Sequence, residues 1–170
     1  MNRIEALKSK IETVDSLQKK LAGWKMLSKK IVFTNGCFDI LHKGHVNYLA
    51  EAAGLGDILI IGVNSDQSVS RLKGPERPLT DESSRTEVLA ALGCVDAVIV
   101  FDAPTPYALI EWIQPDVLVK GGDWNPSDIV GSDIVLAKGG LVTSISFLPG
   151  YSTSLIEKKI KDSVKPGAEN

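Results

Sequence analysis

The sequence predicts an α/β protein built on a doubly wound, five-stranded parallel sheet, with an extra helix at the N-terminus. Three observations predict this fold. Five short runs rich in β-branched residues alternate with segments that have helical periodicity. The runs lack strict alternation of apolar and polar residues, as expected for strands covered on both faces. The chain has 170 residues, 44% hydrophobic and 24% charged, which suits one average globular domain of Rossmann-like type.

The first 29 residues are predicted to form an amphipathic helix. Between Asn2 and Leu27 an apolar residue recurs every three or four positions, which describes one stripe along a helix. The residues of this N-terminal stripe are Ile4, Leu7, Ile11, Val14, Leu17, Leu21, Trp24 and Leu27. The stripe is longer than the rest of the domain needs, so we expect it to pack partly against a second copy of the chain in a homodimer.

Residues 30–162 are predicted to form the functional domain. The expected strands are Ile31–Thr34, Ile58–Val63, Ala97–Phe101, Val117–Val119 and Leu141–Phe147. In doubly wound sheets, ligands bind beyond the carboxyl ends of the strands, so functional residues are expected in the loops that follow strands. The last eight residues, Ser163 to Asn170, contain Pro, Gly and charges and are predicted to be a flexible tail.

Composition excludes several classes of function. With 19 Lys and Arg against 21 Asp and Glu, the net charge is −2, so no basic field exists to bind nucleic acid. The two cysteines, Cys37 and Cys94, are too few for a disulfide framework and indicate a reducing compartment. No apolar run approaches a membrane span. We therefore expect a cytoplasmic protein with no membrane contact.

The loop after the first expected strand holds the only two histidines, His42 and His45, with Gly44 between them and a helix following to Ala53. The free N–H groups of a helix N-terminus favour an anion, and a glycine lets a phosphate approach closely. This pattern predicts a phosphate cradle with two imidazole donors. The alternatives are a zinc site, which lacks a third protein ligand here, and two solvated turn histidines. No metal is expected to bind to the protein's own side chains.

The His42-Lys43-Gly44-His45 sequence, preceded by Gly36–Asp39, resembles the nucleotidyltransferase superfamily marked by His-x-Gly-His. Further segments extend the resemblance over nearly all of Ile31 to Ile160 and are similar to the adenylyltransferases that make ADP-heptose from heptose 1-phosphate. These segments are Asn64–Val69, Leu72–Pro78, Val117–Trp124 and Gly150–Ser154. The resemblance implies ATP as co-substrate, Mg²⁺ carried on the triphosphate, and pyrophosphate as product.

The resemblance also implies roles for individual residues. His42, His45 and Lys73 would be catalytic, because a nucleophile that is already anionic needs charge neutralisation and alignment and no general base. Asp39 and Arg85 would bind the acceptor substrate. Nucleotide binding would fall to Gly36, Cys37, Phe38, Gly44, Arg77, Lys120, Gly121, Asp123, Trp124, Ser152 and Thr153.

Each role has a plainer alternative on residue type alone. Asp39 is equally consistent with a helix cap, Arg85 with a surface helix cation, and Lys120 with a lysine whose head reaches solvent at a strand end. Trp124 suits ordinary packing, and Ser152 and Thr153 suit capping of the last helix, a role compatible with phosphate binding. An isolated cysteine such as Cys37 is more often a buried small residue than a nucleophile.

Lys73 and Arg77 flank Gly74-Pro75 in a polar connection and are either solvated charges or groups that close over an anion. Neither has a partner evident from the sequence. We therefore expect the segment from Arg71 to Pro78 to be mobile without ligand and to become ordered over a triphosphate.

Two other functions remain open. A glycerol phosphate cytidylyltransferase is the alternative within the same class, although such enzymes tend to carry an Arg shortly before the last Ser-Thr pair, where this chain has Leu148–Tyr151. A nucleotide-binding regulator without turnover is the alternative from another class. If the chain is the adenylyltransferase, the resemblance implies that a separate sugar kinase and phosphatase supply its substrate for lipopolysaccharide inner-core synthesis.

Overall fold

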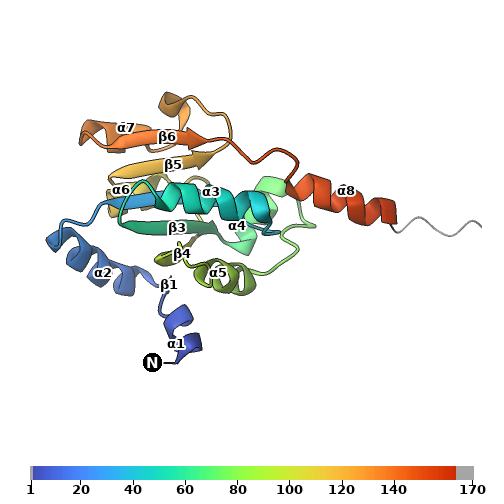
Figure 1. Ribbon diagram of the computed structural model, residues 1–170, viewed down its shortest axis with the longest axis horizontal. Helices are drawn as coiled ribbons and strands as arrows, with labels where there is room; N and C mark the ends of the chain where they lie inside the picture. Colours follow the sequence, from blue (N-terminus) through green and yellow to red (C-terminus); the bar gives the residue numbers. More distant parts are fainter. Residues whose placement is uncertain (1, 164–170) are drawn as a thin grey trace, which may run out of the picture.

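The computed structural model describes residues 2–163 and contains one six-stranded sheet in which every neighbouring pair of strands is parallel. The strand order is β1-β4-β3-β2-β5-β6 (Figure 1). The strands are β1 (Ile11–Glu12), β2 (Ile31–Gly36), β3 (Ile58–Asn64), β4 (Ala97–Phe101), β5 (Val117–Gly121) and β6 (Leu141–Ile145). The predicted α/β class and the five expected strands are confirmed.

The N-terminal segment differs from the prediction. A single helix over Asn2–Leu27 is wrong: the segment forms α1 (Arg3–Lys8), the strand β1 and α2 (Val14–Met26). Thr13 ends the strand and begins α2, because its side chain accepts a hydrogen bond from the backbone N–H of Ser16 in a capping box. The sheet therefore has six strands, not five, and Ile11 pairs in register with Val98 of β4.

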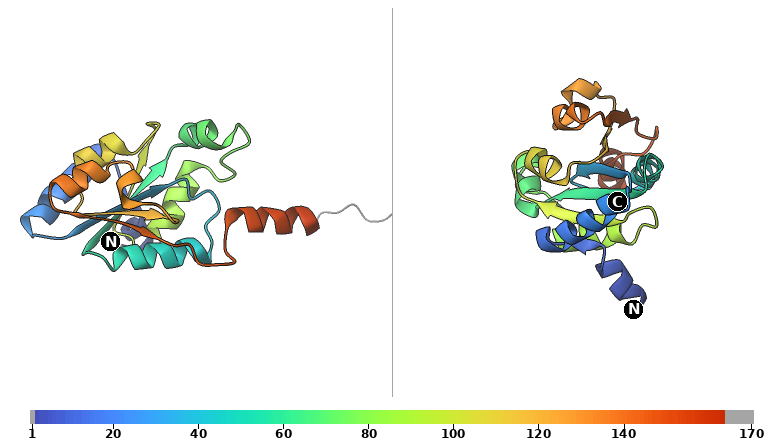
Figure 2. Two further views of the ribbon diagram at one scale, coloured as in Figure 1. Left: turned by 90° about the horizontal axis from the view of Figure 1, so that it is seen from above. Right: turned by 90° about the vertical axis from the view of Figure 1, so that its left-hand side faces the viewer.

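The helices cover both faces of the sheet, as expected for buried parallel strands (Figure 2). One core cluster packs the sheet against α3 (Lys43–Ala53) and α5 (Glu82–Ala90). The other packs it against α2, α6 (Tyr107–Ile113) and α7 (Ser132–Ala137). Leu17 and Leu21 of α2 are buried in the second cluster, so the N-terminal segment shares the core with residues 30–162.

Three further helices complete the chain: α4 (Asp66–Lys73), the 3₁₀ helix η1 (Pro126–Asp128) and α8 (Thr153–Ser163). Helix α8 extends away from the carboxyl end of the sheet, and none of its residues is buried (Figure 1). Ser163 is its last residue; the remainder of the predicted tail lies outside the described residues. Among the described residues, no helix is long and apolar enough to cross a membrane.

The topology reverses between β2 and β5. From β2 the chain proceeds outward through β3 and β4, whereas from β5 it proceeds in the opposite direction to β6. At such a switch point the loops on neighbouring strands turn to opposite faces and leave a crevice at the carboxyl edge. The loop after β2 carries the two histidines, and the end of β5 carries Lys120, so the fold brings both segments to this crevice.

Candidate active site

A cleft of about 530 Å³ opens at the carboxyl edge of the sheet. Ten of the predicted site residues line this active-site cleft. They are Gly36, Cys37, Phe38, Asp39, His45, Lys73, Lys120, Gly121, Trp124 and Thr153. The other six predicted residues are not among those that line the cleft. They are His42, Gly44, Arg77, Arg85, Asp123 and Ser152.

The two histidines form a stacked pair at the start of α3. Their ring centroids are 3.9 Å apart with an interplanar angle of 27°. His42 is the N-cap residue of α3 but makes no side-chain cap, so its ring is left for other contacts. The Nδ1 atoms of His42 and His45 are buried without a hydrogen-bond partner among the described residues. Two polar atoms buried without partners indicate a site built for a ligand.

Close packing explains the small residue between the histidines. A Cβ added to Gly44 would lie 3.0 Å from the His42 ring and 3.3 Å from Cβ of Tyr151. The ring of Phe38 meets His45 edge-on at a centroid distance of 5.5 Å, and Phe38 itself adopts a left-handed φ of 48°. A bulky residue with positive φ is a strained conformation, and such conformations cluster at functional sites.

Both imidazoles are neutral at pH 7 in this arrangement. Burial, together with the smaller effects of His42 and Lys73, lowers the pKa of His45 to about 4. Burial also lowers the pKa of His42. The stacked pair therefore avoids two adjacent imidazolium charges, and an anionic ligand would raise both pKa values.

Lys73 at the end of α4 and Lys120 on β5 face the same cleft from opposite sides. Neither ammonium group takes part in a hydrogen bond or ion pair among the described residues, whose salt bridges involve other cations. Burial lowers the pKa of Lys120. Lys120 lines the cleft, as predicted from its position beside β2, and two unpaired cations in one cleft favour a polyanionic ligand.

Arg77, by contrast, is already paired. Its guanidinium donates to Asp39 at 2.7 Å and to Glu157 of α8. The structure thus gives Arg77 partners that are not evident from the sequence, and the expected mobility of the segment from Arg71 to Pro78 stays a prediction. A local sequence pattern does not predict this pairing, because the partners are 38 and 80 residues away along the chain.

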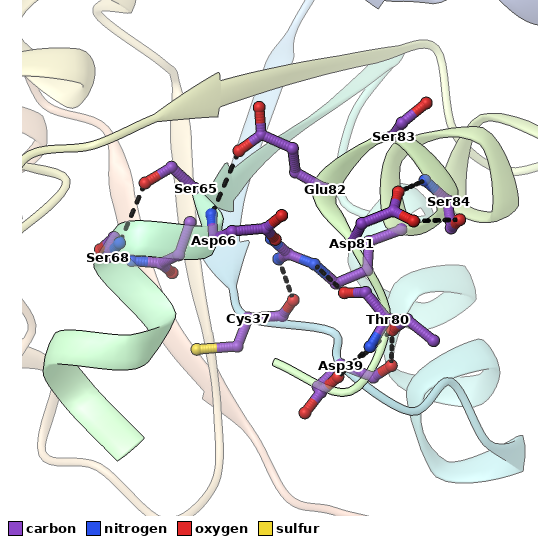
Figure 3. Close-up of polar contacts among 12 residues, drawn as sticks. Cys37, Asp39, Ser65, Asp66, Ser68, Thr80, Asp81, Glu82, Ser83 and Ser84 are labelled. Carbon is purple, nitrogen blue, oxygen red and sulfur yellow. Dashed lines mark hydrogen bonds and ion pairs between the residues drawn. The ribbon is translucent and has the colours of Figure 1, made fainter. Parts of the chain in front are cut away.

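Asp39 organises the loop that precedes α5 (Figure 3). It is 4% exposed, and its carboxylate accepts hydrogen bonds from the backbone N–H groups of Leu79 at 2.7 Å and Thr80 at 3.0 Å. Burial raises its pKa, but the hydrogen bonds from Arg77, Thr80 and Leu79 outweigh burial and hold the pKa below its usual range. The helix-cap alternative for Asp39 is wrong, since no side chain caps α3.

Arg85 is 2% exposed, so the alternative of a surface helix cation is also wrong. Its guanidinium donates to the carbonyl of Cys37 at 2.6 Å, to the carbonyl of Thr80 at 3.1 Å and to Asp66 at 2.8 Å. Figure 3 shows these three acceptors gathered between the loop after β2 and the starts of α4 and α5. Arg85 does not line the cleft itself, but it binds the carbonyl of Cys37, which does.

The segment after β5 forms the opposite wall. Gly121 has no room for a side chain, because an added Cβ would lie 2.7 Å from the Phe147 ring. The indole N–H of Trp124 donates to the carbonyl of Gly121 at 3.2 Å, which fixes a ring that is 50% exposed. Asp123 accepts a hydrogen bond from Ser146 at 2.7 Å and points to that loop, outside the cleft lining.

The start of α8 reaches the cleft through Thr153, the helix's first residue. Ser152 accepts a hydrogen bond from the backbone N–H of Leu155 at 3.2 Å, so its capping role is observed. Phosphate binding at this helix start stays a prediction.

Sequence reasoning missed several residues of the cleft. Asn35 is the last residue but one of β2, and Asn64 is the last residue of β3. The other missed residues include Tyr48, Leu72, Pro104, Thr105, Pro106, Val130 and Phe147. A neutral amide at the end of a buried strand is the signal that would have identified the two asparagines. In residues 2–163 no group of three His, Cys, Asp or Glu side chains is arranged to hold a metal ion.

The chain matches one protein-family model and several curated proteins. The Cytidylyltransferase-like family model matches residues 33–158. The chain is 53% identical over 155 residues to the bifunctional protein HldE of Citrifermentans bemidjiense, covering 91% of this chain and 32% of that protein. It is 55% identical over 149 residues to the bifunctional protein HldE of Wolinella succinogenes, covering 88% and 31%. The chain thus spans about a third of the length of the curated relatives it matches.

Two solved structures share the fold. The lipopolysaccharide core biosynthesis protein from Thermoplasma volcanium has a TM-score of 0.56 and 29% identity, covering 71% of this chain and 97% of that one. The pantoate-β-alanine ligase from Francisella tularensis has a TM-score of 0.57 and 15% identity, covering 89% of this chain and 76% of that one. At 15% identity the likeness shows the fold alone.

Proposed function

The chain belongs to the cytidylyltransferase-like family, and on this premise we propose that it transfers AMP from ATP to D-glycero-β-D-manno-heptose 1-phosphate, releasing pyrophosphate. The observation that carries the proposal is the identity of 53–55% to bifunctional HldE proteins over about nine-tenths of this chain. The cleft supports it, because His45, Lys73 and Lys120 gather unpaired donors and cations at one place.

The reaction requires alignment and charge neutralisation. A phosphate oxygen of the acceptor attacks the α-phosphorus of ATP, the bond to the bridging oxygen breaks, and pyrophosphate leaves with the electron pair. The attacking oxygen is already anionic, so no side chain needs to remove a proton. The groups that the cleft supplies are donors aimed at developing negative charge.

We assign the triphosphate to the start of α3. His42 and His45 each hold one N–H and an unpartnered ring nitrogen there, beside the free backbone N–H groups of the helix. Lys73 neutralises the departing pyrophosphate from the other side of His45, a placement supported by its effect on the pKa of that histidine. Thr153 and Ser152 add hydroxyl and backbone donors from α8.

Mg²⁺ fits this site as an ion bound mainly by phosphate oxygens and water, where it would neutralise charge on the triphosphate. Asp39 is the carboxylate among the residues that line the cleft, and it already accepts hydrogen bonds from Arg77 and from two backbone N–H groups. The chain's own contribution is therefore the set of cations and donors around the phosphates.

The biological setting follows from the same proposal. A sugar kinase and a phosphatase would supply the heptose 1-phosphate, and the product would enter lipopolysaccharide core synthesis in the cytoplasm. The similar protein from Thermoplasma volcanium is named as a lipopolysaccharide core biosynthesis protein, which supports this setting.

The test crosses a panel of nucleoside triphosphates with sugar 1-phosphates and glycerol 3-phosphate and measures pyrophosphate release. The proposal expects the highest kcat/KM with ATP and the heptose 1-phosphate. Preference for CTP and glycerol 3-phosphate would identify a cytidylyltransferase instead. Nucleotide binding without pyrophosphate from any acceptor would identify a regulator.

A further inference from the structure

A second, more enclosed cavity of about 160 Å³ adjoins the active-site cleft. The two cavities share five lining residues, which are Asn35, Pro106, Lys120, Trp124 and Val130. The smaller cavity, here called the side pocket, adds Asp128 of η1 and Ile129. Ile129 belongs to the core cluster of α2, α6 and α7, so the side pocket lies on the face of the sheet opposite α3.

The walls of the side pocket combine an aromatic face with polar groups. Trp124 supplies a ring that is 50% exposed and fixed by its hydrogen bond to Gly121. Asn35 supplies an amide that makes no hydrogen bond within residues 2–163, and Asp128 supplies a carboxylate held on one oxygen by Ser127 at 3.2 Å. Apolar contacts come from Pro106, Ile129 and Val130.

We infer that the side pocket binds the sugar ring of the acceptor, with Asn35 and Asp128 selecting it through its hydroxyl groups and Lys120 holding its phosphate at the junction with the cleft. This inference rests on the proposed function and deepens it, because it says where the acceptor lies and which residues choose a sugar over a smaller phosphate ester.

Position and chemistry both support the assignment. Lys120 lines both cavities, so one ammonium group can hold a phosphate at the point where the attacking oxygen must meet the α-phosphorus. The triphosphate is assigned to the α3 side, which leaves the opposite face for the acceptor. A carboxylate and an amide offer acceptors and donors to several hydroxyls, while the apolar faces of a sugar ring lie against an indole.

Size separates the two acceptor classes. The side pocket encloses about 160 Å³, and a sugar ring would contact more of its walls than the three-carbon chain of glycerol 3-phosphate. A site built to hydrogen-bond substrate hydroxyls rejects an analogue that lacks them, because its polar groups are then left unpaired. The side pocket therefore favours the heptose phosphate.

The test measures steady-state kinetics of Asp128→Asn and Asn35→Ala against the wild type, with heptose 1-phosphate and ATP varied in turn. Losing a hydrogen bond to a charged group predicts a rise in KM for the sugar phosphate of about 10-fold or more in Asp128→Asn, and losing one to a neutral amide predicts about 2- to 10-fold in Asn35→Ala. KM for ATP should stay within about 2-fold. Titration of heptose 1-phosphate into protein holding a non-hydrolysable ATP analogue should show the same loss of affinity. Glu51→Gln, which removes an exposed carboxylate of α3 outside both cavities, is the control and should leave both KM values unchanged.

The outcomes separate the inference from the proposed function. If the wild type makes ADP-heptose and both variants keep its KM for the sugar phosphate, the side pocket does not bind the sugar and the proposed function stands. A change confined to KM for ATP, or to the choice among nucleoside triphosphates, would place the nucleobase there and overturn the inference. If the wild type releases no pyrophosphate with any acceptor, both the function and this inference fail.

Discussion

Arg77 and Asp39, both predicted to bind ligands, bind each other across 2.7 Å. The Asp39 side chain is 1% exposed and that of Arg77 is 19% exposed, so the pair is largely shielded from solvent. Asp39 also holds the backbone of Leu79 and Thr80. The pair therefore ties the loop before α5 to the turn that carries the two histidines.

Replacing Asp39 should destabilise the protein. Asp39→Asn keeps the size of the side chain but removes the charge that Arg77 and two backbone N–H groups bind, so we expect the free energy of unfolding to fall by about 1–3 kcal/mol. Chemical denaturation of the variant and the wild type at pH 7 measures this difference.

The same variant should change the response to acid. The folded-state pKa of Asp39 is lowered, so its contribution to stability is present above the unfolded-state pKa near 3.8 and is lost as the pH falls through the folded-state value. The wild type should lose more stability than Asp39→Asn below about pH 4. Equal losses in the two proteins would mean that the Asp39 pair does not contribute.

Glu157 should weaken anion binding by competing for Arg77. Its carboxylate pairs with the guanidinium from α8, so Glu157→Gln frees one side of the cation. We expect the affinity for pyrophosphate, measured by titration calorimetry, to rise by up to about 5-fold, as for one partly exposed ion pair. Asp162→Asn, an exposed carboxylate of the same helix outside the ion pairs of residues 2–163, serves as control. An unchanged affinity in Glu157→Gln would exclude this competition.

Arg85 should be a positioning residue whose loss costs stability. Arg85→Met leaves Asp66 and the carbonyls of Cys37 and Thr80 without their donor, and breaking such a buried pair costs about 3–5 kcal/mol. Arg71→Met is the matched control, because its ion pair with Asp102 is exposed and worth less than about 1 kcal/mol. Thermal unfolding of both variants checks the contrast, and equal losses would contradict it.

A homodimer remains our prediction from the N-terminal stripe. The structure buries Leu17 and Leu21 but leaves Ile4 66% exposed, Val14 57% exposed and Leu27 65% exposed, so part of the stripe still faces solvent. A second copy would cover this apolar area. Light scattering at micromolar concentration should give twice the 18.3 kDa chain mass. A monomer at that concentration would rule the dimer out.

The sequence predicted the central sheet because each buried parallel strand is a continuous β-branched run, and it placed Lys120 beside the histidines because strand order follows from the fold class. It missed β1 because a strand of two residues, Ile11 and Glu12, does not interrupt a helical spacing of apolar residues. The spacing of apolar residues within one segment cannot show that β1 pairs with β4, a strand more than 80 residues away.

The pairing of charged residues is the second feature that the sequence did not predict. A charged residue in a helical segment is expected to be exposed. Arg85 is buried instead, because three hydrogen-bond acceptors from separate segments surround its guanidinium. Motifs likewise identify histidines and lysines but pass over neutral amides such as Asn35, whose importance depends on the cavity around it. The positions of these side chains depend on tertiary contacts that no local pattern contains.

His42 and His45 should act as donors to transition-state charge. Replacing either by Ala should lower kcat by about 10²–10³, the usual effect of removing one preorganised donor. ATP affinity should change less, because Lys73, Thr153 and the backbone of α3 remain. Both side chains border the cleft, so the free energy of unfolding at pH 7 should change little. Single-turnover kinetics and nucleotide titration separate rate from binding.

The titration of His45 provides the sharper measurement of the same role. Its pKa in the folded protein is about 4, below the ordinary value of 6.5, so the unfolded chain binds more protons between these values. The wild type should therefore lose stability as the pH falls from about 6.5 to 4, and His45→Ala should lose less. Bound pyrophosphate should raise the pKa of His45, because a nearby anion favours the imidazolium. NMR titration of the imidazole protons follows the shift, and a pKa that stays the same with pyrophosphate bound would show that His45 does not contact the phosphates.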